Sequence, residues 1–248
     1  MVLGLTEAIR GCLFDMDGVL TRTADVHTAA WQQMFDEFLR DRSAKQGNDF
    51  RAFDPVADYN EYVDGKPRLD GARAFLHSRG IDLPDGAADD PPGTWTVHGL
   101  SNRKNDLVLA KLKQDGVAVY DGSLRYLRAV REAGLKCAVV SSSEHTRQVL
   151  DAAGITGMFD ARVDGTTAAH DHLPGKPAPD MFLAGAAAVH LPAAACAVFE
   201  DATAGVEAGH AGGFGLVVGV DRVGHADQLR AHGADVVVAD LAELLDRR

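Results

Sequence analysis

The chain is poor in cysteine and has no long apolar run. Its three cysteines, Cys12, Cys137 and Cys196, are an odd number without a Cys-x-x-Cys spacing, which favours neither a disulfide framework nor a zinc site. No stretch approaches the roughly 18 apolar residues of a membrane span. Arg10 follows the first apolar residues instead of preceding them, unlike the charge of a secretion signal. We therefore expect a cytoplasmic protein without membrane contact.

Basic residues are also few relative to acidic ones. Lys and Arg together number 25 against 36 Asp and Glu, which gives a formal net charge of −11. This balance argues against nucleic acid or an anionic membrane as a partner, and an anionic substrate would need a local basic pocket. At 248 residues, the chain is long enough for one large domain or for a core with a second, smaller domain.

Two patterns of apolar residues divide the chain. Residues 1–24 and 116–248 show short apolar strands alternating with helices, which predicts a Rossmann-like parallel sheet with helices on both faces. Residues 25–115 show helical periodicity and no clear strand, which predicts an inserted all-helical cap domain. The expected strands are 11–14, 136–140, 159–163, 195–200, 215–220 and 235–239, and the expected helices are 23–42, 57–62, 71–79, 104–115, 123–133, 144–153, 179–189, 203–211 and 226–232.

Two carboxylates, Asp15 and Asp17, follow the first expected strand. Open α/β sheets bind their ligands beyond the carboxyl ends of their strands, and alternate residues of extended chain point the same way. Gly18 allows a sharp turn around a small anion or ion. This arrangement suits phosphoryl chemistry, in which one carboxylate attacks while its neighbour handles protons.

Two later loops offer groups that bind phosphate. Ser141 to Ser143 follow the second expected strand, where hydroxyls and backbone N–H groups bind phosphate oxygens, although a serine run before a helix is often a plain N-cap. Lys176 lies between Gly175 and Pro177. A lysine held by turn residues can offset the charge on a transferring group, although most lone lysines are solvated.

A third loop begins with the adjacent acids Glu200 and Asp201, after another apolar strand. Together with Asp15 they offer carboxylate oxygens, the ligands that Mg²⁺ prefers. The simpler interpretation is that Asp201 or Thr203 caps the next helix, but this leaves Glu200 unexplained. The loop therefore predicts a magnesium site.

In this order, each after a strand, these motifs resemble the haloacid-dehalogenase-like (HAD-like) superfamily over nearly the whole chain. The resemblance implies that Asp15 is the nucleophile, which forms an aspartyl-phosphate. It implies that Asp17 is the general acid and base and lends a backbone carbonyl to Mg²⁺. The residues implied to hold the phosphoryl group are Ser141 and Lys176, and those implied to complete the metal site are Glu200 and Asp201.

Three motifs of the helical insert are residues 23–27 with Trp31 one turn on, residues 62–68, and the Asn-Arg-Lys-Asn-Asp run 102–106. In these motifs the insert resembles that of the β-phosphoglucomutase-like subfamily. The resemblance implies that His27, next to the hinge, bonds near the acid/base aspartate, that Arg68 binds the phosphate that is not transferred, and that Lys104 contacts the sugar phosphate. His27 and Trp31 share a helix face, and on spacing alone both would be packing residues. The candidate binding residues are Thr23, Trp31, Gly65, Arg68, Lys104, Ser141, Ser142, Ser143 and His145.

The expected activity is that of a monomeric, Mg²⁺-dependent enzyme that interconverts β-glucose 1-phosphate and glucose 6-phosphate through a sugar bisphosphate. A mutase must bind a phosphate at each end, and Arg68, Lys104 and Ser143 would supply the second site. Two departures leave a sugar-phosphate phosphatase open, because Asp64 replaces a basic residue of the subfamily and His145 replaces an asparagine. A non-catalytic sugar-phosphate-binding protein is a remote alternative, since every catalytic position holds a competent residue.

Overall fold

The computed structural model describes residues 3–47 and 49–246, which form two compact units. Residues up to Arg22 and from Val117 onward make one unit, here called the α/β unit. Thr23–Gly116 make the other, here called the helical unit. Among the described residues, no helix is both long enough and apolar enough to span a membrane.

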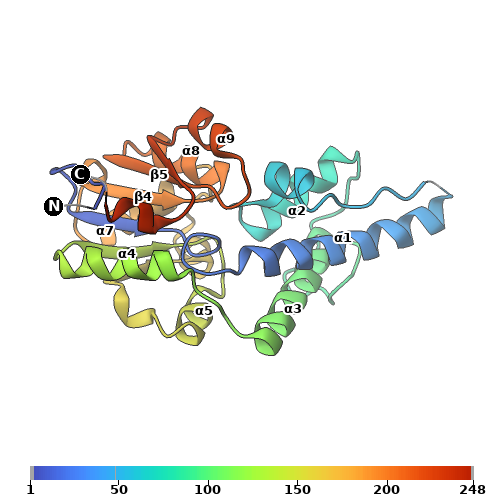
Figure 1. The fold of residues 1–248 in the computed structure, drawn as a ribbon. Coiled ribbons are helices and arrows are strands. Elements are labelled where there is room, and N and C mark those ends of the chain that lie inside the picture. The colour runs from blue at the N-terminus through green and yellow to red at the C-terminus, as the bar shows by residue number, and fades with distance from the viewer. Residues whose placement is uncertain (1–2, 48, 247–248) are drawn as a thin grey trace. The chain divides into compact units, whose positions relative to one another are not determined.

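The α/β unit is built on a parallel sheet (Figure 1). In the described residues this sheet has six strands, in the order β3-β2-β1-β4-β5-β6. The strands are β1 (Gly11–Phe14), β2 (Lys136–Val140), β3 (Ala161–Val163), β4 (Cys196–Glu200), β5 (Leu216–Val220) and β6 (Val236–Val238). On one side of β1 the chain adds β2 and then β3. It then adds β4, β5 and β6 in turn on the other side of β1. The order therefore reverses between β1 and β4, the place where open α/β sheets bind ligands.

Helices cover both faces of this sheet, as the sequence predicts. Leu13 of β1 clusters with Met181 and Phe182 of α7, whereas the next residue, Phe14, meets Tyr126 of α4 edge-on, with ring centroids 6.5 Å apart. The β1 and β4 strands are buried at every position, which explains their apolar runs. The helices are α4 (Asp121–Glu132), α5 (Thr146–Ala152), α6 (Gly165–Asp171), α7 (Asp180–Ala188), α8 (Thr203–Ala211) and α9 (Ala226–Ala231), with short 3₁₀ turns η2 (Thr156–Met158), η3 (Ala193–Ala195) and η4 (Leu241–Leu244).

The helical unit contains α1 (Ala24–Gln46), the π-helical turn η1 (Tyr59–Val63), α2 (Arg68–Ser78) and α3 (Val97–Asp115), and its described residues form no strand. Its core is aromatic. Phe35 of α1 stacks on Trp31 at 5.2 Å and meets Phe75 of α2 at 4.1 Å between ring centroids. One face of the Trp31 ring therefore packs in the core of the helical unit.

Three of the elements that differ from the sequence-based expectation are helical. The helix α6 was not predicted, because it is only seven residues long and follows β3 directly; Asp164 caps it by accepting from the Thr167 N–H at 2.9 Å. The helix α3 begins at Val97 instead of 104, since Thr96 Oγ1 caps it by accepting from the Gly99 N–H at 2.9 Å. The helix expected over 57–62 is the single turn η1.

The three cysteines lie in β1, β2 and β4, as predicted, and all are buried and free. Burial raises the pKa of the Cys196 thiol to about 11. A thiol in this state is a poor nucleophile and a poor metal ligand. The cysteines therefore contribute to packing and not to the chemistry of the protein.

Candidate active site

The loop Asp15–Thr21, here called the catalytic loop, leaves the sheet at the carboxyl end of β1. The Asp15 N–H donates to Phe199 O of β4 at 2.9 Å, and the Gly18 and Thr21 N–H groups close the loop on Thr21 O and Met16 O. Gly18 has a φ of +85°, and a Cβ there would overlap Asp201 Oδ2. Only glycine fits this position, which brings the loop directly against the Asp201 carboxylate.

Lys176 contacts two carboxylates, that of Asp15, directly after β1, and that of Glu200, the last residue of β4. Its Nζ lies 2.6 Å from Asp15 Oδ1 and 2.6 Å from Glu200 Oε1, and it also donates to Val140 O of β2 at 3.2 Å. The Lys176 side chain is fully buried. These contacts fix the ammonium between three neighbouring strands, so the lysine that the sequence suggested is buried among the candidate site residues and is not solvated.

The pKa values in this cluster follow from burial and from its charges. Burial raises the pKa of the Asp15 carboxyl well above its ordinary value, the Lys176 charge opposes that rise, and the charges of Glu200 and Asp17 add to it. Burial works to lower the pKa of Lys176, but the charges of Asp15 and Glu200 outweigh it and raise that pKa. Lys176 is therefore held as a cation.

Three carboxylates could hold a metal ion here. Asp15, Glu200 and Asp201 each offer an oxygen, and these oxygens lie within 4.8 Å of one another. Three carboxylates against one ammonium leave two negative charges, the charge that a divalent cation balances, and all-oxygen donors suit Mg²⁺. The cluster thus fits the expected magnesium. Among the described residues, the carboxylate of Asp17 is not part of this cluster.

The position of Glu200 depends on the helix that follows it. Its Oε2 accepts from the Ala202 N–H at 2.9 Å, and a Cβ on Gly205 of α8 would overlap its carboxylate. Glu200 is fully buried. The N-cap of α8 is Ala202, and not Asp201 or Thr203 as the simpler interpretation expected. The Glu200 carboxylate lies against the start of α8 and faces Lys176.

The serine loop after β2 borders the same cluster. Ser141 is buried and follows Val140, whose carbonyl accepts from Lys176. Ser141 Oγ accepts from the Ser143 N–H at 3.1 Å, and Ser143 Oγ accepts from the His145 N–H at 3.2 Å. Ser142 lies between them. The serines thus shape a turn, and α5 begins only at Thr146, two residues later than expected.

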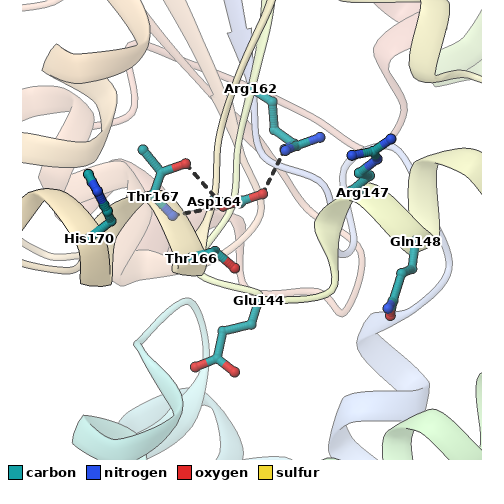
Figure 2. Close-up of a pocket in the computed structure, with 8 residues that line it drawn as sticks. All are labelled: Glu144, Arg147, Gln148, Arg162, Asp164, Thr166, Thr167 and His170. Atoms are coloured by element: carbon teal, nitrogen blue, oxygen red, sulfur yellow. Dashed lines mark hydrogen bonds and ion pairs between the residues drawn. The ribbon is translucent and has the colours of Figure 1, made fainter.

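A hollow of about 500 Å³ lies beside this turn, between α5 and α6 (Figure 2). Figure 2 shows that Arg162 points at Asp164, with Nε 2.6 Å from Oδ2, and that Thr167 donates to the same carboxylate. Arg147, its other arginine, has Asp151 at 3.8 Å. Its cations already lie near carboxylates, so the hollow does not supply a phosphate site comparable with the cluster around Lys176.

In the helical unit, His27 of α1 and Lys104 of α3 are brought together. Lys104 is buried; its Nζ lies 2.8 Å from His27 Nδ1 and 4.9 Å from the centre of the Trp31 ring. Because an ammonium has only donors, Nδ1 must be the acceptor, which places the imidazole proton on Nε2. Thr23, also buried, precedes α1.

Arg68 begins α2, three residues after Gly65, and its Nη1 donates to Asn105 Oδ1 at 2.7 Å. Asn105 follows Lys104 in the same motif, but sequence reasoning did not assign it a role. Its position in that motif was the available signal. The structure therefore links the Arg68 and Lys104 candidates through neighbouring residues of α3.

Comparisons with known proteins agree with this architecture. A family model described as haloacid dehalogenase-like hydrolase matches residues 9–213. A β-phosphoglucomutase of Mycobacterium tuberculosis (strain CDC 1551 / Oshkosh) is 57% identical over 247 residues, which cover 98% of this chain and 94% of that protein. A β-phosphoglucomutase of Bacillus subtilis (strain 168) is 30% identical over 236 residues, or 95% of this chain and 92% of that protein.

The fold has counterparts among solved structures. A crystal structure of β-phosphoglucomutase from Clostridium difficile superposes with a TM-score of 0.73 at 24% identity and covers 95% of this chain and 93% of that one. At this identity the match supports the fold alone, whereas the family model and the closer relatives reach over most of the sequence. The chain belongs to the haloacid dehalogenase-like enzymes and, among them, to the β-phosphoglucomutase-like proteins.

Proposed function

We propose that this protein is a Mg²⁺-dependent phosphomutase that interconverts β-glucose 1-phosphate and glucose 6-phosphate through a sugar bisphosphate and an Asp15 phosphate. The relatives named β-phosphoglucomutase support this substrate. The observation that carries a mutase over a simple phosphatase is Lys104, a buried ammonium in the helical unit at 2.8 Å from His27. Hydrolysis of a phosphate monoester needs no such second cationic site.

The proposed reaction begins at Asp15. Its carboxylate attacks one phosphorus of the sugar bisphosphate, the bond from that phosphorus to the C1 oxygen breaks, and Asp17 gives that oxygen a proton, which releases glucose 6-phosphate. In the return step Asp17 takes the proton from the C6 hydroxyl of an incoming β-glucose 1-phosphate, which attacks the aspartyl-phosphate, restores the bisphosphate and releases the Asp15 carboxylate. The same residue thus serves as acid and then as base.

A carboxylate and a phosphate dianion repel each other, so the site must offset negative charge. Lys176 is held at 2.6 Å from Asp15 and supplies a fixed positive charge during transfer. Ser141 would bind a phosphoryl oxygen through its hydroxyl or backbone N–H. Mg²⁺ held by Asp15, Glu200 and Asp201, with the Asp17 carbonyl, would supply the remaining positive charge.

The second phosphate would be bound by cations of the helical unit. Arg68 offers a planar guanidinium, which suits phosphate oxygens, and Lys104 offers an ammonium oriented by His27. Ser143 and His145 would contribute from the serine loop. In this scheme the bisphosphate reverses its ends between the two transfer steps.

The test is product identification. Purified protein is incubated with β-glucose 1-phosphate, Mg²⁺ and a trace of glucose 1,6-bisphosphate, and ³¹P NMR follows the products. We expect glucose 6-phosphate, no reaction after removal of Mg²⁺ with EDTA, and recovery when Mg²⁺ is added back. Release of inorganic phosphate without glucose 6-phosphate would contradict the mutase and establish the phosphatase alternative.

A further inference from the structure

The turn Asp221–His225 lies between β5 and α9, and its internal hydrogen bonds fix the backbone that carries the side chains of Arg222 and His225. Asp221 Oδ1 accepts from the N–H groups of Gly224 at 2.7 Å and of His225 at 2.9 Å. These bonds close the turn on its first residue. No motif of the sequence pointed to this turn, and the mechanism proposed above does not use it.

Arg222 reaches from this turn to the catalytic loop. Its Nε donates to Gly18 O at 2.8 Å, and its Nη2 donates to Val19 O at 3.3 Å. At its other edge, Nη1 donates to Ala239 O at 2.9 Å and contacts Asp240 Oδ2 at 3.2 Å. A guanidinium presents donors in a rigid plane, so the contacts at one edge fix the direction of the other.

The guanidinium of Arg222 packs over the Tyr120 ring. Arg222 Cζ lies 3.7 Å from the ring centroid, within the range of a cation–π interaction. The Tyr120 N–H in turn donates to Leu20 O at 3.0 Å. Arg222 and the Tyr120 N–H thus contact three consecutive carbonyl groups of the catalytic loop, those of residues 18–20.

The same turn also contacts the loop that carries Asp201. His225 Nε2 lies 3.0 Å from Asp201 O, and because a carbonyl only accepts, Nε2 carries the proton. Gly18 packs against the Asp201 carboxylate. Arg222 and His225 therefore hold two loops at the point where they touch.

We propose that Arg222 is a positioning residue of the active site, which fixes the catalytic loop through the Gly18 and Val19 carbonyls, and that His225 extends this control to Asp201. Val19 O also accepts from Ser123 Oγ at 2.6 Å, so it keeps a partner without Arg222. In the described part of the chain, Gly18 O has Arg222 as its hydrogen-bond donor, and Gly18 is buried. Loss of Arg222 leaves this carbonyl unsatisfied two residues beyond Met16 and three beyond the nucleophile, where a shift of about 1 Å can cost about 10²-fold in rate.

The inference rests on the proposed role of Asp15 in phosphoryl transfer, but not on the identity of the sugar. The test compares Arg222→Met, which keeps an unbranched chain over Tyr120 and removes every donor, with Arg230→Met as the control. Arg230 is an exposed arginine of α9 that pairs with Asp227. Two measurements are made: hydrolysis of p-nitrophenyl phosphate, and amide hydrogen exchange by mass spectrometry.

For Arg222→Met we expect kcat to fall about 10²-fold with KM changed less than about twofold, because the substrate-binding groups are untouched. Amides of residues 16–21 should exchange at least about tenfold faster, while those of β1 and β4 keep their rates. Arg230→Met should change neither. Unchanged exchange at 16–21, unchanged kcat, or faster exchange throughout the sheet would overturn the proposal.

If Arg222→Met does not fold, Arg222→Lys is measured in the same way. The guanidinium contacts its acceptors through three separate nitrogens at two edges, which one ammonium nitrogen cannot replace, so a smaller loss of the same kind is expected. A wild-type protein that turns over p-nitrophenyl phosphate but not β-glucose 1-phosphate would contradict the mutase and leave this test intact. If the wild type turned over neither, the exchange comparison needs no catalysis and would still decide whether Arg222 positions the loop.

Discussion

The two units each bury a lysine, and the contacts described for these two lysines differ. In the α/β unit, Lys176 lies 2.6 Å from each of two carboxylates. In the helical unit, Lys104 contacts an imidazole, and Arg68 donates to an amide oxygen. The first arrangement places a cation between opposite charges, and the second includes hydrogen bonds that orient a cation.

This difference predicts that substitutions in the two units have different effects on stability and on activity. Removing one partner of a buried ion pair costs about 3–5 kcal/mol, because the other charge stays buried. Losing a hydrogen bond between a cation and a neutral group costs about 1.5–3 kcal/mol. Substitutions around Lys176 should therefore reduce both stability and turnover, whereas those at Arg68 should act mainly on the sugar phosphate.

The largest expected effect is that of Asp15→Asn on turnover. Asparagine keeps the shape of the side chain but is no nucleophile, so kcat should fall by at least about 10⁴-fold. Lys176 keeps Glu200 as a partner, and the melting temperature should change by only a few degrees. Residual activity of a few per cent, measured by ³¹P NMR, would place the nucleophile elsewhere.

Lys176→Met should have the largest effect on stability. It leaves Asp15 and Glu200 buried without their cation, and we expect a loss of about 3–5 kcal/mol in the free energy of unfolding at pH 7. Without the opposing charge of Lys176, burial raises the pKa of the Asp15 carboxyl further above its ordinary value, so the loss should shrink as the pH falls from 7 to 5 and Asp15 takes up a proton. Urea unfolding of the variant and of the wild type at pH 7 and at pH 5 measures this loss of stability.

The matched control is Lys136→Met. Lys136 pairs with Asp160 at 3.1 Å, but its side chain is 55% exposed, and exposed pairs contribute about 0–1 kcal/mol. Equal losses for Lys136→Met and Lys176→Met would show that burial of the ion pair does not matter.

Much of the α/β unit could be predicted because its strands are buried on both faces. The expected strand 136–140 and the expected helix 203–211 match β2 and α8 to the residue, since each has a clear apolar pattern that ends at polar or glycine residues. The positions of Asp15 and Ser141 after strands, and of Glu200 at the end of one, also follow from such patterns, because parallel strands end at one edge of the sheet.

Contacts between distant segments could not be predicted in this way. Arg222 and Gly18 are 204 residues apart, and Arg68 and Asn105 are 37 apart. An arginine after a strand has no periodicity that reveals its partner, and only the packed fold brings it to a carbonyl. The short helix α6 was missed for a related reason: its start depends on one side-chain cap, Asp164.

A smaller effect on turnover, but the sharpest test of the helical unit, is expected from Arg68→Ala. Mutase turnover should fall about 10²-fold, because a charge-assisted pair with phosphate contributes about 1.5–3 kcal/mol. Hydrolysis of p-nitrophenyl phosphate, which has no second phosphate, should change less than about threefold. Arg73→Ala, on the exposed side of the same helix, should alter neither activity. Equal losses of both activities in Arg68→Ala would remove Arg68 from substrate recognition.

The smallest effect on stability is expected from a substitution of Asp160. This half-buried aspartate lies outside both sites and provides a comparison with the buried cluster. Its pKa is lowered by the Cys137 N–H, which donates to it at 2.9 Å, and by Lys136. A carboxyl with a depressed pKa stabilises the fold above the pKa of the unfolded chain, about 3.9, and this stabilisation is lost as the pH falls through the folded value. Asp160→Asn should therefore cost about 1 kcal/mol at pH 7, and the difference from wild type in urea unfolding should narrow below about pH 4. A difference that stays constant down to pH 3 would mean that the charge of Asp160 is irrelevant, and that only the hydrogen-bond geometry of this aspartate matters.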